Sequence, residues 1–481
     1  MGRGAGPWRM GTVATIAAAA LAAAGCTVPL GPGYTIEQQR LEAAVVRSPE
    51  PHVDVHASWR VKNTGDRPLR WLDVEVPDAE THGLGGLRIE SGGAEVVPGH
   101  ATYGSAVRIP FEQPLEIKSR REIAVSYSLA GGAGVVAEDA GFALPPGDWA
   151  PVLLPPEGQG AFARGSDPPK KWDMTVRVPT GFRVYASGHE HGQRNEGQDV
   201  EFRYQERRGG GLPYAAGGAY QEERIALQSG AVILWTRQAM PQGLAERVAA
   251  AAEWSATFYN QAFGILGEKA WAVRVIECVS REDCWAVPRA ALLRPELFAT
   301  DFGTSGVREM NRQLARTWLD FRVHPDWSEE PYPMSAVADY AADLAAAGSG
   351  AEGARRRILH ERMEDFNRLE LPERAIAPLN VRMTDSPAVR RYAEFQSELF
   401  FFALEDEAGS ENVQRGLKHL LGTYAGGVWR ATDLRSAVEL ECGKDLGPLF
   451  RQWLTEPGIP REFRRRYGGV AEGAQGASEE Q

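Results

Sequence analysis

The chain has 481 residues, of which 43% are hydrophobic and 24% charged, and a formal net charge of −11. This composition excludes an intrinsically disordered chain, and the length predicts two or three domains rather than one core. The negative charge argues against nucleic acid as a partner and against electrostatic adhesion to anionic lipid.

The amino-terminal residues have the order of an export signal. Arg3 and Arg9 precede an apolar run from Val13 to Ala24 that is too short to span a membrane as a helix. The segment 21–26 ends this run, and its last four residues resemble a bacterial lipobox. We therefore expect removal of the signal peptide 1–25 and a lipid on the thiol of Cys26, which anchors the protein to the outer side of a bacterial cell membrane.

Two alternatives to this interpretation are an ordinary cleaved signal with a chance cysteine and an uncleaved anchor. Removal of residues 1–25 would take away two positive charges and change the net charge from −11 to −13.

Residues 26–50 are predicted to form a tether and lead-in, and residues 51–228 a β region. Short runs with period-two alternation recur in this region and are separated by turn residues; examples are 53–59, 71–76, 122–127 and 172–178. Such a pattern is typical of antiparallel sheets and predicts a sandwich or saddle.

From residue 229 the pattern becomes mostly helical. A strand at 232–235, a helix over Leu244–Phe263 and a short strand at 272–276 come first. Seven more helices are predicted at 305–323, 334–347, 352–368, 388–407, 411–422, 431–441 and 446–455. We expect a mostly α-helical domain with a small sheet over 229–465, a disordered polar tail over 466–481, and hence a multidomain α+β fold.

Cysteines and histidines form no recognisable metal-binding cluster in the sequence. Cys278 and Cys284 lie six positions apart, and in an exported protein they could close a short loop as a disulfide. Cys442 is predicted to be a buried free thiol. His189 and His191 could face the same side of a strand, but the flanking glycines favour a solvated turn.

The segment 307–340 carries the most specific pattern. Apolar residues at 307, 310, 314, 318 and 321 form the stripe of an amphipathic helix, and Arg312 and Arg316 lie one turn apart on its other face. Here the chain resembles the membrane alanyl aminopeptidases, a family of gluzincin (thermolysin-like) zinc peptidases with the motifs HExxHxW and EGFAxY. The family has eighteen residues between the second His and the Glu of EGFAxY, as this chain has between Arg316 and Ser335.

This resemblance implies a zinc site whose donor atoms have been replaced. The three ligand positions are occupied by Arg312, Arg316 and Ser335, and the general-base position by Gln313. A guanidinium stays protonated and offers no lone pair to a metal, and a neutral amide cannot act as the base. We therefore expect no zinc and no other cofactor.

Two further motifs of the family have counterparts here. A looser match of 283–288 to the family's G-x-M-E-N segment puts Ala286 where the substrate's amino group is held. Tyr392 matches the tyrosine that stabilises the oxyanion in the family. The resemblance covers most of residues 130–460.

Arg312 and Arg316 allow two interpretations. They could form a cationic fork for a carboxylate or phosphate group of a ligand. They could instead form helix ion pairs with Glu309 and Asp320, three or four residues away on the same face, and we favour this structural interpretation.

The sequence therefore predicts a catalytically inactive relative of zinc aminopeptidases, retained at the cell surface as a peptide- or protein-binding protein or a scaffold. Its candidate binding residues are Arg312, Arg316, Tyr392 and Ala286. The alternatives are an active metallopeptidase or other hydrolase with a non-standard site, and a purely structural envelope component.

Overall fold

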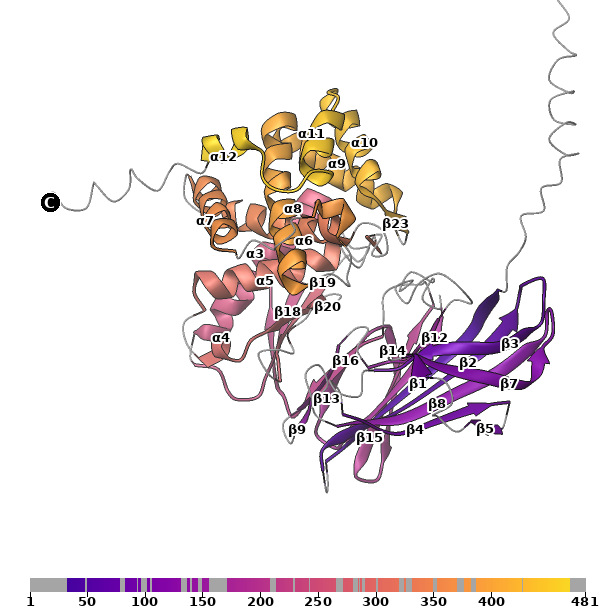
Figure 1. Cartoon of the computed structure of the whole chain (residues 1–481). Coiled ribbons are helices and arrows are strands. Elements are labelled where there is room, and N and C mark those ends of the chain that lie inside the picture. Colours follow the sequence, from indigo (N-terminus) through magenta and orange to yellow (C-terminus); the bar gives the residue numbers. More distant parts are fainter. Residues whose placement is uncertain are drawn as a thin grey trace, which may run out of the picture.

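A computed structural model of the chain shows a β-rich amino-terminal region and a mostly helical carboxy-terminal domain (Figure 1). Among the helices it describes, none combines the length and the hydrophobicity needed to cross a bilayer. The structure describes residues 33–47, 50–77, 83–92, 94–96, 102–103, 106–130, 136–138, 141–145, 149–154, 171–207, 213–227, 230–241, 243–264, 271–279, 284, 286–287, 290–299, 302–319, 324–325, 331–348, 353–369, 376–381, 386–425 and 427–467.

An eight-stranded sheet forms the centre of the β region. Its strand order is β14-β15-β12-β1-β2-β8-β4-β5, and β1 and β12 form a parallel pair within otherwise antiparallel neighbours. The strands are β1 (Tyr34–Val46), β2 (His52–Asn63), β4 (Leu84–Ser91), β5 (Ala94–Val96), β8 (Arg120–Ala130), β12 (Trp172–Pro179), β14 (His189–Glu196) and β15 (Asp199–Glu206).

Two smaller sheets share the apolar core of the large one. Their orders are β13-β16-β10-β9 and β11-β3-β7-β6. Trp59 of β2, Val74 of β3 and Trp149 belong to one buried cluster, so the β region is a sandwich of sheets, as predicted. The strands are β3 (Leu69–Glu75), β6 (Thr102–Tyr103), β7 (Ala106–Leu115), β9 (Val136–Glu138), β10 (Gly141–Leu144), β11 (Val152–Leu154), β13 (Arg183–Ala186) and β16 (Ala215–Gly218).

Strand β1 corrects the expected lead-in over 26–50. It pairs with β2 along its whole length and with β12, so it lies inside the large sheet and not on a tether. Its Leu41, Ala43 and Val45 alternate into the core, whereas the polar run 37–40 at its centre conceals this period in the sequence.

A five-stranded sheet begins the helical domain, in the order β17-β18-β19-β21-β20. The strands are β17 (Gln221–Ala226), β18 (Gly230–Thr236), β19 (Trp271–Glu277), β20 (Ala286–Val287) and β21 (Ala290–Leu293). Since β17 pairs with β18, this sheet starts before the predicted boundary at residue 229. Val232 and Leu234 of β18 face the helices, and Ile233 and Trp235 face the β region. Burial on both faces explains the continuous apolar run in β18.

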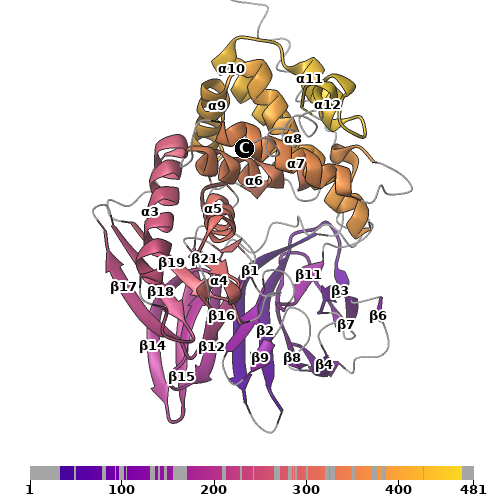
Figure 2. The ribbon, with the colours of Figure 1, turned by 90° about the vertical axis from the view of Figure 1, so that its left-hand side faces the viewer.

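The helices cover one face of this sheet, with α3 and α5 directly against it (Figure 2). Every helix predicted from periodicity is present, and α3 has the predicted bounds. The elements are α3 (Leu244–Phe263), α4 (Glu296–Ala299), α5 (Thr304–Leu319), α6 (Pro331–Gly348), α7 (Ala354–Arg368), α8 (Pro387–Ala408), α9 (Ser410–Thr423), α10 (Ala431–Cys442), α11 (Gly447–Leu454), α12 (Arg461–Tyr467), a 3-10 turn (Pro378–Asn380) and the paired short strands β22 (His324–Pro325) and β23 (Val428–Trp429).

An aromatic cluster joins the other face of the five-stranded sheet to the β region. The ring of Tyr185 in β13 lies 6.2 Å from that of Tyr214 and 6.5 Å from that of Trp235. The guanidinium of Arg274 in β19 lies over the rings of Tyr185 and Trp235. The two parts of the chain therefore share a packed interface.

Candidate functional site

Helix α5 carries Arg312 and Arg316, the two arginines that the sequence resemblance aligns with the family's zinc-binding histidines. Its stripe of Met310, Leu314 and Trp318 is buried, each with at most 2% of its surface exposed. On the same helix the Asn311 carbonyl accepts a hydrogen bond from the hydroxyl of Tyr259 in α3, at 2.8 Å. This packing fixes the rotation of α5 and turns Arg312 and Arg316 away from the sheet.

Arg312 is paired with acids from two other helices. Its Nε lies 2.5 Å from Oδ1 of Asp339 in α6, and its Nη2 lies 3.5 Å from Oε1 of Glu394 in α8. The Asp339 side chain is 2% exposed, whereas that of Arg312 is 41% exposed. The adjacent Asp339 carboxylate raises the pKa of Arg312 above its ordinary value, so its charge is permanent.

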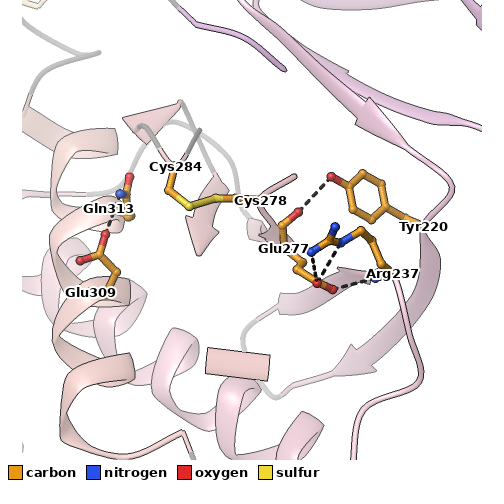
Figure 3. Close-up of a disulfide and its surroundings, with 7 residues drawn as sticks. All are labelled: Tyr220, Arg237, Glu277, Cys278, Cys284, Glu309 and Gln313. Atoms are coloured by element: carbon orange, nitrogen blue, oxygen red, sulfur yellow. Dashed lines mark hydrogen bonds and ion pairs between the residues drawn. A yellow bond between two sulfur atoms is a disulfide. The ribbon is translucent and has the colours of Figure 1, made fainter. Parts of the chain in front are cut away.

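For Arg312, these partners take the place of the expected helix ion pair with Glu309. Glu309 instead accepts a hydrogen bond from Nε2 of Gln313 at 3.0 Å, one turn along the same helix (Figure 3). Asp320, the second expected partner, lies outside the described residues. Acids on neighbouring helices approach Arg312 more closely because α5, α6 and α8 pack together around it.

The other two positions that the resemblance assigns to zinc ligands lie in the same neighbourhood. Arg316 is half-buried one turn after Arg312, and its charge lowers the pKa of Glu394, although burial raises that pKa more strongly. Ser335 lies on α6 one turn before Asp339, and its side chain is outside the described part. Because α5 and α6 pack side by side, the segments bearing residues 312, 316 and 335 converge (Figure 2).

A second arginine extends this pairing deeper into the helices. Arg362 of α7 binds both carboxylate oxygens of Asp343 in α6, at 2.9 and 3.0 Å, and lies 3.3 Å from Glu398 in α8. Arg308 of α5 lies 3.8 Å from Asp343. We call the whole set the arginine–carboxylate network; its members are Arg308, Arg312, Arg362, Asp339, Asp343, Glu394 and Glu398.

Gln313 lies at the position that the sequence resemblance assigns to the family's general base. Its side chain is buried, and its Oε1 has no hydrogen-bond partner among the described residues. An amide at this place can donate or accept a hydrogen bond but cannot take a proton from water.

Strand β20, which contains Ala286, lies at the edge of the five-stranded sheet beside α5. Ala286 pairs with Ala291, and the Val287 carbonyl lies 3.4 Å from the hydroxyl of Thr317 in α5. The expected correspondence of this strand to the family's substrate-binding segment is consistent with that position. The side chain of Ala286 is outside the described part.

A disulfide precedes this edge strand. Cys278 and Cys284, the pair considered from the sequence, are joined, with their Cα atoms 5.5 Å apart (Figure 3). Cys278 directly follows β19 and is buried. The bond therefore ties the chain entering β20 to the middle of the sheet.

Sequence reasoning missed a group on the other side of this disulfide. Glu277 is buried and accepts hydrogen bonds from the backbone N and from Nε of Arg237, at 2.8 and 3.0 Å. The Tyr220 hydroxyl donates to the Glu277 carbonyl at 2.9 Å (Figure 3). These contacts link residues that are distant in sequence, and no local sequence pattern predicts them.

Tyr392 contacts a different part of the domain. Its ring lies 5.0 Å from that of Phe366 in α7, and a Cβ added to Gly458 would lie 3.4 Å from its hydroxyl. The side chain is buried, and burial raises its pKa. These contacts describe packing between α7, α8 and the chain before α12, and none of them involves Arg312 or Arg316.

Zinc does not fit the residues present here. The position next to Asp339 is filled by the guanidinium of Arg312, a cation that repels a divalent metal and gives it no lone pair. The described residues hold no group of three or more His, Cys, Asp or Glu side chains placed to bind a metal. His189 and His191 are both exposed on β14, an edge strand. Cys26, the predicted lipidation site, is outside the described residues.

Comparison with known proteins gives the fold. No family model matches the chain. A stretch of 65 residues is 31% identical to "Probable aminopeptidase 1" of Saccharolobus solfataricus, covering 14% of this chain and 8% of that protein.

Solved structures match over nearly the whole chain. The M1 zinc metallopeptidase of Deinococcus radiodurans superposes with a TM-score of 0.61 at 17% identity, covering 90% of this chain and 96% of that one. A mutant of that enzyme bound to a Tyr-Ser-Ala substrate matches with a TM-score of 0.59 at 16% identity, covering 89% and 95%. The β sandwich and helical domain of this chain therefore have the architecture of an M1 metallopeptidase.

Proposed function

We propose that this chain is a catalytically inactive relative of the M1 zinc aminopeptidases that acts as a lipid-anchored binding or scaffolding protein on the outer side of a bacterial cell membrane. One observation carries the proposal. Arg312, at the position of the first zinc ligand, is held by Asp339 and Glu394, so a fixed cation occupies the place where a peptidase needs a donor atom.

The lost chemistry supports the same conclusion. Metal-assisted peptide hydrolysis needs a polarised water and a base that removes its proton. Gln313 supplies no base, and Arg312 and Arg316 supply no metal ligand. An isolated phenol such as Tyr392 could stabilise an oxyanion but could not generate the nucleophile.

A binding role is supported by the charged side chains that are exposed around Arg312. The side chains of Arg312 and Glu394 are 41% and 31% exposed, so polar groups of both signs reach the surface at α5, the helix that also contacts edge strand β20. Since two carboxylates offset the charge of Arg312, the cationic fork for a single anion is the weaker interpretation. Mixed charge next to a strand edge suits a peptide or a protein segment.

The test uses residues 27–481, which contain every described element. The purified chain is incubated with excess zinc, dialysed and examined by native mass spectrometry and elemental analysis. We expect no stoichiometric zinc and no turnover of aminoacyl or peptide reporters. One tightly held zinc per chain, or turnover abolished by a chelator, would overturn the proposal and select an active metallopeptidase.

Lipid attachment is tested on the full chain produced in a bacterial host. Mass spectrometry of the amino-terminal peptide should show a chain that begins at Cys26 and carries acyl groups. An unmodified cysteine, or retention of residues 1–25, would contradict the anchor without affecting the conclusion on zinc.

A further inference from the structure

Helix α12 presents an arginine-rich surface at the end of the helical domain. Phe463 and Tyr467, one turn apart, face inward, and the ring of Phe463 lies 4.9 Å from that of Trp453 in α11. At 100° per residue, Arg461 and Arg465 then lie opposite the inward face. All four arginines of α12 are exposed; we call them the α12 arginine face, and they are Arg461, Arg464, Arg465 and Arg466.

Among the described residues, most of this charge has no carboxylate partner. Arg466 lies 3.3 Å from Asp406, which is also 3.8 Å from Arg355 of α7. In the part of the chain that the structure describes, no carboxylate pairs with Arg461, Arg464 or Arg465. Like charges one helical turn apart, such as those at positions 461 and 465, destabilise a helix. An anionic partner outside the chain would offset this repulsion.

Some arginines elsewhere on the surface are paired with carboxylates. In the β region Nη2 of Arg60 lies 2.6 Å from Glu122, and Nε of Arg108 lies 2.8 Å from Asp73. The α12 arginine face thus differs from these paired surface residues. Four arginines and one glutamate give α12 a charge of +3 on a chain whose total is −11.

We propose that the α12 arginine face docks on the anionic headgroups of a phospholipid membrane. The choice of a membrane over a soluble polyanion rests on the proposed lipid anchor at Cys26. Only seven residues separate Cys26 from Tyr34, the first residue of β1, and the eight residue-to-residue steps between them reach about 28 Å even when fully extended. Such a short tether keeps the protein beside the membrane and raises the effective concentration of headgroups around α12.

The fold separates the two contacts. The first described strand, β1, lies in the β region, and α12 lies at the far end of the helical domain (Figures 1 and 2). A lipid at one end and a charged contact at the other would lay the long axis of the molecule along the membrane. The negative total charge repels the other faces of the protein from an anionic membrane. The attraction between the arginines of α12 and the headgroups acts over only about 8 Å at physiological ionic strength. Net charge therefore excludes general adhesion but not a local contact through α12.

The test uses the unlipidated chain 27–481 and sedimentation with vesicles of phosphatidylcholine alone or mixed with phosphatidylglycerol. Binding should rise with the phosphatidylglycerol fraction and fall with added salt. The variant Arg461→Gln, Arg464→Gln, Arg465→Gln should lose on the order of 100-fold in partition coefficient. The matched control removes the same three charges from exposed arginines of other elements, and its partition coefficient should change little. This control is the variant Arg70→Gln, Arg88→Gln, Arg224→Gln.

Circular dichroism shows whether both variants fold, since the inward residues Phe463 and Tyr467 are unchanged. Equal binding to both kinds of vesicle, or equal loss in the two variants, would overturn the proposal. Binding to heparin without binding to phosphatidylglycerol vesicles would also overturn it and select a soluble polyanion. Because the vesicle assay uses chain without lipid, its result is independent of whether Cys26 proves to be acylated.

Discussion

Glu398 shows how the buried acids of the network set the response to pH. Burial raises the pKa of Glu398 well above its ordinary value, and burial likewise raises that of Asp343, although Arg362 opposes both shifts. In the unfolded chain these groups titrate near their ordinary values of about 4. At pH values between the pKa of these groups in the unfolded chain and their higher pKa in the folded protein, the folded state binds more protons. The free energy of unfolding therefore falls as the pH rises through this range. Acidification from neutral pH toward about 5 should therefore raise the free energy of unfolding.

Urea unfolding at pH 5.5 and pH 8 measures this effect. Glu398→Gln, which is neutral at every pH, should reduce the difference between the two midpoints. Glu411→Gln is the matched control, because the Glu411 side chain is 92% exposed, and it should leave the difference unchanged. An identical pH dependence in wild type and Glu398→Gln would show that this carboxyl does not titrate in the window.

At the scale of elements, Arg362 joins three helices. It lies on α7, its side chain is 14% exposed, and its partners Asp343 on α6 and Glu398 on α8 are 1% and 5% exposed. Removing the cation leaves two buried carboxyl groups without compensation, so Arg362→Ala should lower the free energy of unfolding by about 3 kcal/mol. Arg368→Ala on the same helix, where the side chain is 71% exposed, should cost less than about 1 kcal/mol. Equal effects in chemical denaturation would contradict a structural role for the network.

The elements differ in how far the sequence determines them. Helix α3 was predictable to its ends because its apolar residues keep a helical period between Gly243 and Gly264. Strand β1 was hidden by polar residues, including Gln39, which is itself buried. The partners of Arg312 could not be found locally, because Asp339 lies 27 positions away on another helix. The candidate ligand positions come from a sequence motif, whereas the acids that pair with Arg312 depend on tertiary packing.

At the scale of the whole molecule, ion pairs join α5, α6 and α8 within a fold of M1 architecture. The β sandwich, the five-stranded sheet and α5 and α6 keep the M1 architecture at 17% identity to the Deinococcus enzyme. Between α5, α6 and α8 the link is made by Arg312, Asp339 and Glu394. Because the packing has the M1 architecture, our proposal that the donor atoms were exchanged predicts that the framework still places metal ligands correctly when they are introduced.

Restoration of the donor set tests this prediction directly. The fourfold variant Arg312→His, Gln313→Glu, Arg316→His, Ser335→Glu should bind zinc, because the two new imidazoles lie one turn apart on α5 and the new carboxylate lies on the adjoining α6. The +2 charge of the metal would also replace Arg312 as the counter-charge of Asp339. Native mass spectrometry should show one zinc per chain, and zinc at 100 times its dissociation constant should stabilise the fold by about 2.7 kcal/mol. The variant that lacks only Ser335→Glu should bind more weakly, since it offers two protein ligands instead of three. A folded fourfold variant that takes up no zinc would contradict this prediction and would show that α5 and α6 do not hold the geometry of a zinc site.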